Sequence, residues 1–521
     1  MALFRKRKKK PEEERLTESR RYKEKNRGKS ARAAGGAEAE TGRGTGKSGT
    51  SIRTRNKEFA VVTYLFLLIF LGWIVYFAWF MFFRAESVIN NSYNARTETF
   101  AKQTVRGDIL SNDGTVLATT QTDEEGNETR VYPYANEFAH VVGYTIQGSY
   151  GIEKISNFYM LRSHEFLPQR ILKQLTGQKS DGDNVVTTLD VSLQEAAYNA
   201  LGSHQGAVVA LDPESGEILA MVSKPDFDPN TLADDWSSIT SDSSQSLLLN
   251  RATQGSYPPG SIFKIFATVE YLREHNGSGD DYFFDCSGEL TQDGSTIHCY
   301  HNTVHGQEDL ESSFANSCNA SFANIGLNLN LSNYIELVND SLFNTALPTN
   351  FEYKKSNFSL SESASSAEIM QTVIGQGQTT VSPYHMALLA SAIANDGELV
   401  TPYVVDHIEN NAGDLVKSFH TESYGRIFSE SECKVLQQYM EYTVENGTAR
   451  GLSGQSYTAG GKTGTAEFSD SSDSAHAWFI GYAYQEGYGK IAIAVIVEDS
   501  GSGGTYAVPV AKSVFDAYFS E

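Results

Sequence analysis

The sequence predicts an α+β protein, an α-β sandwich with a central antiparallel sheet and a helical subdomain, plus an N-terminal β-rich pedestal and one transmembrane helix. Three observations support this prediction. Apolar, strand-like runs lie at both ends of the region 186–521, mainly helical sequence lies between them, and one long uncharged run lies near the N-terminus. Strands from both ends of a region can share one sheet if the intervening chain forms an insert.

The first 57 residues are expected to form a disordered, basic cytoplasmic tail. They hold 19 Lys and Arg against 7 Asp and Glu and few large apolar residues, so burial cannot offset the entropy lost on ordering. The basic charge leaves contact with a membrane surface or nucleic acid as an alternative to a solvated tail. The fragment 42–48 is no phosphate-binding loop, because Thr41 stands where the first glycine of that motif belongs.

Residues 58–84 are predicted to form a transmembrane helix. The run Phe59–Phe83 carries no charge and is longer than the roughly 20 apolar residues that span a bilayer. Basic residues precede the run and only Arg84 follows it, so the positive-inside rule places the tail in the cytoplasm and the remaining chain outside. A cleaved signal peptide is disfavoured, because the run is too long and residues 83–86 lack a small-residue cleavage pattern.

Residues 85–185 are expected to form the pedestal. Within them, Arg106–Ala118 contains two short strand patterns around an Asn-Asp-Gly turn, which is a hairpin signal. The chain beyond the transmembrane helix is strongly acidic, with 22 basic against 56 acidic residues. This charge argues against nucleic acid as a partner.

Residues 186–521 are expected to form the main domain. Its predicted elements are a helix, two strands, two later strands and a closing helix: Val191–Leu201, Gly206–Leu211, Glu217–Ser223, Ala477–Tyr484, Ile491–Glu498 and Val508–Phe519. The strands are almost continuously apolar, as expected for a sheet that is covered on both faces. Ser382-Pro383 is expected to open a further helix within the insert.

The stretch Tyr257–Lys264 contains the strongest candidate for chemistry. Two prolines and a glycine predict a bend, and apolar residues at helical spacing follow, which places Ser261 at the start of a buried helix. Lys264 lies one turn later on the same face, where a neutral amine could take the proton of the serine. Alone, Ser-x-x-Lys is a weak signal, because Ser431–Lys434 matches it too and is expected to be ordinary helix surface.

Two further motifs follow along the chain. Ser317–Asn319 lies between apolar segments and is expected at a bend between two helices. Lys462–Thr465 belongs to a glycine-flanked extended segment that could bring backbone close to a ligand. Either motif alone could be a helix cap or a turn, and Ser92–Asn94 matches the first of them as well. Chance does not readily supply all three motifs in this order, each in a suitable local setting.

With these motifs the sequence resembles the penicillin-binding proteins and serine β-lactamases, whose signature is Ser-x-x-Lys, Ser-x-Asn and Lys-Thr-Gly. The segment from Arg106, His140–Tyr144 and Gly148–Glu153 also resemble the pedestal of class B penicillin-binding proteins. The resemblance implies the penicillin-recognising serine transpeptidase (β-lactamase-like) fold. It further implies a D,D-transpeptidase that cross-links peptidoglycan, is a target of β-lactams, and has no room in its pedestal for a glycan-polymerising domain.

The resemblance also assigns catalytic roles to the matching residues. Ser261 would be acylated by a stem peptide that ends in D-Ala-D-Ala. Lys264 would be the general base, although the family leaves the proton acceptor open. Ser317 and Lys462 would relay a proton to the leaving D-alanine.

Substrate-binding roles follow in the same way. Asn319 would hold the substrate amide, and Lys462, Thr463 and Thr465 would bind the terminal carboxylate, which requires a fixed cation and hydroxyl donors. Gly464 belongs to the same substrate-binding segment. The backbone N–H groups of Ser261 and Thr465 would form the oxyanion hole.

The same motifs occur in D,D-carboxypeptidases and β-lactamases, which use water as the acceptor, and in membrane-anchored β-lactam sensors. The pedestal and the anchor argue against the two hydrolases, and the lack of a visible fold in the tail argues against a sensor. By resemblance, the expected partners are stem peptides, β-lactams and a polytopic SEDS-type glycan polymerase in the membrane. No cofactor is expected.

The four cysteines are too few for a disulfide scaffold. Cys286 and Cys299 flank a glycine-rich turn and are candidates for a disulfide, which their spacing leaves open. The alternative is a metal site that includes the nearby histidines His298, His301 and His305. This spacing fits no standard zinc pattern, so no metal is expected. Cys318 is interpreted as a small packed residue.

Overall fold

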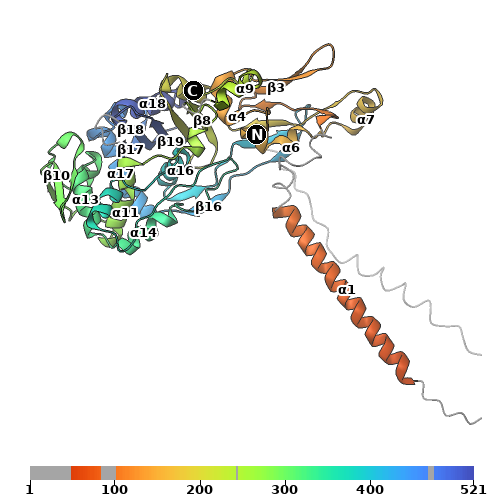
Figure 1. The fold of residues 1–521 in the computed structure, drawn as a ribbon, viewed down its shortest axis with the longest axis horizontal. Coiled ribbons are helices and arrows are strands. Elements are labelled where there is room, and N and C mark those ends of the chain that lie inside the picture. The colour runs from red at the N-terminus through yellow and green to blue at the C-terminus, as the bar shows by residue number, and fades with distance from the viewer. Residues whose placement is uncertain (1–48, 84–100, 242–244, 468–474, 521) are drawn as a thin grey trace, which may run out of the picture. The chain divides into compact units, whose positions relative to one another are not determined.

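The computed structural model of the chain describes residues 49–83, 101–241, 245–467 and 475–520. These residues form two units, an N-terminal helix and a larger folded part, each of which is described by itself (Figure 1). Most of the predicted tail, residues 1–48, lies outside the described residues, as does the start of the predicted pedestal up to residue 100.

The N-terminal unit is the helix α1 (Gly49–Phe83). Its stretch Phe59–Met81 is long and apolar enough to cross a membrane, by length and composition. Nearly all described side chains of this stretch are exposed, which suits a lipid surrounding. The helix begins upstream of the predicted boundary at residue 58, because an established helix gains one hydrogen bond for each residue that extends it. Residues 49–57 are therefore helical, in contrast to the predicted disorder.

The larger unit is built around a five-stranded antiparallel sheet with the order β17-β18-β19-β7-β8. Its strands are β7 (Gly206–Leu211), β8 (Ile218–Lys224), β17 (Thr458–Glu467), β18 (Ala475–Tyr484) and β19 (Lys490–Val497). The four strands predicted from apolar runs are confirmed. Strand β17, which carries the third motif, is an edge strand of the described sheet.

Helices cover both faces of this sheet. The helices α8 (Val191–Leu201) and α18 (Gly503–Tyr518) pack on one face, and α16 (Pro383–Ala394) packs on the other. Side chains of β7 alternate between the two cores: Val208 packs on the side of α8 and α18, and Val209 on the side of α16. The sandwich of one sheet between helices, as the sequence predicts, is confirmed.

The chain between β8 and β17 forms the predicted helical insert. Its helices, apart from α16, are α9 (Leu232–Ser241), α10 (Arg251–Gln254), α11 (Lys264–Glu274), α12 (Leu310–Ala315), α13 (Asn319–Asn328), α14 (Leu331–Asp340), α15 (Ser366–Val373) and α17 (Glu430–Asn446). The small strands are β9 (Phe284–Cys286), β10 (Glu289–Gln292), β11 (Ser295–His298) and β12 (Gly306–Glu308). Helix α16 begins after Ser382, whose side chain caps it, as predicted. Figure 1 shows β10, α11, α13 and α14 gathered at one end of this unit.

The pedestal contains a six-stranded sheet with the order β15-β14-β6-β2-β3-β4. Its strands are β2 (Ile109–Leu110), β3 (Val116–Thr122), β4 (Glu128–Val131), β6 (Asn184–Thr187), β14 (Val405–Glu409) and β15 (Leu415–Ser418). The antiparallel pairing of β2 with β3 confirms the predicted hairpin. Strands β14 and β15 come from the main domain, so the boundary expected after residue 185 falls inside β6 of a shared sheet.

Short elements complete the larger unit. They are β1 (Thr104–Val105), α4 (Ala139–Val142), α5 (Gly151–Ile155), α6 (Asn157–Met160), α7 (Leu167–Leu175), β5 (Ser180–Asp181), β13 (Glu398–Val400) and β16 (Ser423–Arg426). Helix α7 lies at the opposite end of this unit from β10 (Figure 1). The pedestal and the part of the helical insert around β10 are therefore the two extremities of the larger unit.

An ion cluster around a buried glutamate joins three segments of the pedestal. Glu153 is fully buried, and its carboxylate accepts hydrogen bonds from Arg106 Nε (2.7 Å) and Arg130 Nε (2.7 Å). The Tyr132 hydroxyl donates to the same carboxylate (3.2 Å). Burial alone would raise the pKa of Glu153, but the two guanidinium groups outweigh it and hold that pKa below its ordinary value. Glu153 is therefore the buried counter-charge of two largely buried arginines.

We expect Glu153→Gln to lower the free energy of unfolding by about 3–5 kcal/mol, because two buried guanidinium groups lose their partner. Urea unfolding of the full chain in detergent measures this loss. The matched control is Glu352→Gln, which removes the solvent-exposed pair with Lys154, the neighbour of Glu153 in the sequence. That variant should lose about 1 kcal/mol or less. Equal losses in both variants would contradict the structural role of the buried cluster.

Candidate active site

Ser261 lies at the junction of the central sheet and the helical insert. The Pro258 carbonyl accepts a hydrogen bond from Trp478 Nε1 (3.0 Å), and the Tyr257 hydroxyl donates to Glu498 Oε1 (2.6 Å). These contacts hold the segment before the serine against the sheet. The chain then forms a 3-10 turn, Gly260–Phe263, that runs directly into α11. The serine therefore begins a buried helix, as its sequence predicts.

Two glycines permit the close packing around this serine. Gly260 has a φ of +57°, and a Cβ there would lie 2.7 Å from the carbonyl oxygen of Thr465 in β17. Gly375 has a φ of +77°, and its carbonyl accepts a hydrogen bond from the Gly260 N–H (2.9 Å). A Cβ on Gly375 would lie only 1.9 Å from the Gly260 oxygen. Only glycine fits at these two positions, and together they set the distance between Ser261 and β17.

Lys264 is completely buried, and its amine contacts the second motif. Lys264 Nζ donates to the Ser317 carbonyl (2.7 Å) and to Asn319 Oδ1 (2.7 Å), and it lies 3.3 Å from Ser317 Oγ. Ser317 lies between α12 and α13, as predicted, with a left-handed φ of +57°. In this conformation both its carbonyl and its hydroxyl face the amine of Lys264.

Lys462 approaches the same hydroxyl from the third motif. It is completely buried on β17, and its Nζ donates to Ser317 Oγ (2.9 Å) and to the Thr463 carbonyl (3.1 Å). The hydroxyl of Ser317 is thus shared by two amines, one from each of the other motifs. The three motifs, far apart in the sequence, meet at this one oxygen.

Burial changes the protonation of both amines. It lowers the pKa of Lys264 to about 8. Burial also lowers the pKa of Lys462 well below its ordinary value, and the nearby charge of Lys264 lowers it further. Two cations this close repel each other, so a proton on one amine disfavours a proton on the other. A neutral amine has the free lone pair that a general base requires.

A cleft of about 1240 Å³ lies beside these residues. Its lining includes five residues of the three motifs: Ser261, Ser317, Asn319, Thr463 and Thr465. Thr463 and Thr465 are two positions apart on β17 and therefore share one face of the strand. The cleft is larger than the roughly 300–1,000 Å³ of typical small-molecule sites, so it has room for an extended peptide.

One predicted contact is not formed. Among the described residues, Ser261 Oγ has no hydrogen-bond partner, and the amine of Lys264 contacts Ser317 and Asn319 instead. Catalytic hydrogen bonds often shorten only when substrate binds, so a base need not contact its serine in the free protein. The competing match, Ser431–Lys434, lies on α17, where Lys434 is exposed and pairs with Glu430 (2.6 Å), as expected for helix surface.

Several residues that line the cleft belong to none of the three motifs. Thr448 and Arg450 follow α17 and line the cleft, and Thr448 Oγ1 lies 2.5 Å from Thr463 Oγ1. The segment 296–303 lines it as well, although its sequence indicated only a glycine-rich turn. The pattern Gly375-Gln376-Gly377 is a sequence signal for this part of the site, because paired glycines often mark a close backbone approach.

Comparison with known families accounts for both parts of this architecture. Residues 206–516 match the penicillin binding protein transpeptidase domain. The chain belongs to this family. Residues 106–185 match the penicillin binding protein A dimerisation domain. The two domains together make the chain a class B penicillin-binding protein, as its sequence suggested.

Similar proteins span most of this penicillin-binding protein. The peptidoglycan D,D-transpeptidase PbpA of Mycolicibacterium smegmatis is 29% identical over 471 residues, which cover 84% of this chain and 94% of that protein. The peptidoglycan D,D-transpeptidase MrdA of Acinetobacter baumannii is 28% identical, with 75% and 66% covered. The ceftriaxone acyl-enzyme complex of penicillin-binding protein A from M. tuberculosis is similar in structure, with a TM-score of 0.73, 27% identity, and 81% of this chain and 99% of that chain covered.

We expect Gly375→Ala to slow the acylation of this protein by benzylpenicillin by about 10-fold or more, because the added Cβ displaces Gly260 and with it Ser261. Stopped-flow or quenched-flow measurement of the acylation rate tests this. The control is Gly377→Ala, which has a similar φ of +78° but open space around the new Cβ. Both variants carry the same backbone strain, so equal rates would contradict the role of Gly375 in placing the serine.

Proposed function

We propose that this class B penicillin-binding protein is a peptidoglycan D,D-transpeptidase in which Ser261 is the acylated nucleophile. The observation that carries the proposal is the pair of buried amines, Lys264 and Lys462, that share the hydroxyl of Ser317 beside the start of the serine helix. The acyl-enzyme complexes that ceftriaxone and imipenem form with penicillin-binding protein A from M. tuberculosis support a covalent route.

In the proposed acylation, Ser261 Oγ attacks the carbonyl between the two terminal D-alanines of a stem peptide. Its proton passes to the neutral amine of Lys264, and the tetrahedral intermediate then collapses. The C–N bond to the last D-alanine breaks, and the leaving nitrogen takes a proton from Ser317 Oγ, which Lys462 replaces through its hydrogen bond of 2.9 Å. In the complex the terminal carboxylate of the substrate, bound beside Lys462, favours the protonated form of that amine, whose pKa is low in the free protein. The product is an ester between Ser261 and the shortened stem peptide.

The remaining residues of the motifs orient the substrate in this proposal. Asn319 holds a backbone amide of the stem peptide, and Thr463 and Thr465, on one face of β17, bind the terminal carboxylate with Lys462. The close packing at Gly464, where a Cβ would lie 3.0 Å from the Pro259 oxygen, keeps this strand against the serine segment. The backbone N–H groups of Ser261 and Thr465 stabilise the oxyanion, for which each donor contributes roughly 3–4 kcal/mol in other acyl-transfer enzymes.

An acceptor amine from a second stem peptide completes the reaction. It attacks the ester carbonyl, loses its proton to the same lysine and serine groups, and releases Ser261 as a hydroxyl. Water in the place of the amine would give a D,D-carboxypeptidase or a β-lactamase, and a stable acyl-enzyme without turnover would give a sensor. The transpeptidase is favoured because two relatives whose similarity covers at least 75% of this chain are named as D,D-transpeptidases.

The apolar stretch of α1 supports a single-pass membrane protein. We infer from the basic residues before this stretch that the N-terminus is cytoplasmic and the catalytic domain is outside the membrane. By family resemblance, a SEDS-type glycan polymerase contacts the anchor and the pedestal. This places cross-linking next to the site of glycan synthesis.

Intact-mass spectrometry of the full chain in detergent is the direct test of the proposed function. With benzylpenicillin we expect one long-lived adduct on Ser261, and with a D-Ala-D-Ala thioester analogue plus an acceptor amine we expect an amide product. Ser261→Ala should give neither. Rapid loss of the adduct to water would identify a hydrolase, and an adduct that persists in Ser261→Ala would exclude this serine.

The acylation rate should depend on pH through Lys264. Its amine must be neutral to accept a proton, so the rate constant should rise about tenfold per pH unit below pH 8 and level off above it. Lys264→Ala should lose about 10²–10⁴-fold in rate while it keeps the thermal stability of a folded protein. Lys434→Ala, which alters the competing Ser-x-x-Lys match, should acylate normally. A flat pH profile between 6 and 9 would remove Lys264 as the base.

A further inference from the structure

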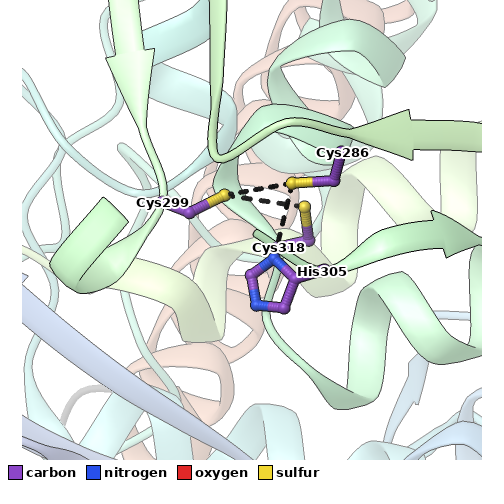
Figure 2. A group of neighbouring side chains, drawn as sticks. All are labelled: Cys286, Cys299, His305 and Cys318. Carbon is purple, nitrogen blue, oxygen red and sulfur yellow. Dashed lines mark hydrogen bonds between the residues drawn. The ribbon is translucent and has the colours of Figure 1, made fainter. Parts of the chain in front are cut away.

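A second cluster of reactive side chains lies next to the active site. Three of the four cysteines and one histidine point toward a common centre, namely Cys286, Cys299, His305 and Cys318 (Figure 2). The sulfur atoms of Cys286 and Cys299 are 3.6 Å apart and both thiols are free, so the candidate disulfide is not formed. Cys318 is buried and packed, as expected, and its sulfur also lies 3.7 Å from that of Cys299.

The fold gathers these residues from separate segments. Cys286 ends β9, whose partner β12 begins at Gly306, and the pairing of Cys286 with Gly306 brings His305 beside it. Cys299 follows β11, and Cys318 caps the N-terminus of α13. Because the ligands come from two strand pairs and a helix cap, no short sequence pattern could reveal them. His298 and His301, which the sequence also suggested, are not members of the cluster.

The distances match those of a tetrahedral zinc site. Zinc bonds of about 2.3 Å to sulfur and about 2.0–2.1 Å to nitrogen place two sulfurs about 3.8 Å apart, and a sulfur and a nitrogen about 3.5 Å apart. Here the two sulfur pairs that include Cys299 measure 3.6 and 3.7 Å, and Cys286 Sγ lies 3.5 Å from His305 Nδ1. All four ligand atoms lie within 4.8 Å of one another.

The surroundings suit thiolates that bind a metal. The three cysteines are at most 2% exposed, and His305 is half-buried. Two backbone N–H groups donate to sulfur, that of Gly288 to Cys286 and that of Ser321 to Cys318, each at 3.4 Å. Such donors orient ligands and stabilise their negative charge, and the N-terminus of α13 adds its positive field at Cys318.

We propose that Cys286, Cys299, His305 and Cys318 bind one Zn²⁺ ion. Three thiolates and one imidazole in a tetrahedron are ligands that zinc prefers, and four protein ligands leave no open position for substrate or water. The site is therefore structural. On binding, the zinc displaces the thiol protons, which are released to solvent.

The zinc site would fix the second catalytic motif. Cys318 is the central residue of that motif, between Ser317 and Asn319. On the other side of the cluster, Asn319 Nδ2 donates to the His298 carbonyl (3.0 Å), one residue before Cys299. The ion thus ties the β10–β11 segment to the motif from two directions. It holds the left-handed Ser317, whose φ of +57° is unfavourable for a serine, in the position that both lysines require.

Metal analysis of the full chain, purified in detergent without chelator, tests the proposal. We expect about one Zn²⁺ per chain by inductively coupled plasma mass spectrometry, and Co²⁺ substitution should give the visible absorption of a tetrahedral thiolate complex. Cys286→Ala and His305→Ala should each lower the zinc occupancy about 10-fold or more at limiting free zinc. Cys433→Ala, which alters the fourth cysteine, buried in α17 outside the cluster, should keep the ion.

Thiol counting separates zinc from oxidation. Under denaturing conditions with chelator, the zinc-bound chain should alkylate at all four cysteines. Metal-free protein that alkylates at only two cysteines would mean a disulfide within the cluster and would overturn the proposal. Metal-free protein with four alkylated cysteines would overturn it as well, provided that added zinc does not bind.

The effect on catalysis rests on the proposed function, whereas zinc content does not. Chelation should slow the acylation of Ser261 by benzylpenicillin about 10-fold or more, and added zinc should restore it, because Ser317 loses its fixed position. If zinc-loaded protein forms no adduct, the proposed function fails and the zinc site stands. If zinc is removed and the acylation rate does not change, the coupling between the site and the motif is refuted.

Discussion

The arrangement of the active-site elements depends on two lysine amines that share one serine hydroxyl. Lys264 and Lys462 are completely buried, so their amines are withdrawn from bulk water. Ser317, Asn319 and the backbone therefore have to satisfy them, within 3.3 Å. This requirement brings together the start of α11, the junction between α12 and α13, and the edge strand β17. It also makes a proton on one amine disfavour a proton on the other, which is the property that the proposed mechanism uses.

The close approach of these elements depends on backbone contact more than on side-chain packing. Gly260 and Gly375 allow three segments to touch through their carbonyl and N–H groups. The pedestal shows the same principle at larger scale, because β14 of the main domain pairs directly with β6. A main-chain pairing between domains is stiffer than a contact between side chains, so the two domains share one sheet as well as one chain.

The sequence predicted the parts of this structure that depend on local pattern. Apolar runs indicated the strands β7, β8, β18 and β19, and motif spacing indicated Ser261, Ser317 and Lys462. Parts that depend on distant pairing were not predictable. Nothing near residue 405 indicated that it joins the pedestal sheet, and nothing in the spacing of Cys286 and Cys318 indicated that a helix cap would meet the end of β9. Arg106 and Glu153 lie in separate pedestal segments of the sequence, and only the fold shows that they form one ion cluster.

The position of β17 at the edge of its sheet affects how the protein could change under selection by inhibitors. An edge strand leaves one row of backbone N–H and C=O groups free to pair with an extended ligand, in addition to its side chains. Every residue except proline supplies both main-chain groups, so a single substitution along this strand cannot delete them unless it introduces proline, which would also disturb the strand. Variants that weaken binding there would have to shift the strand itself. Such a shift would weaken the binding of the natural peptide as well as the binding of any inhibitor that imitates its backbone. Few single substitutions would therefore give resistance without a loss of activity.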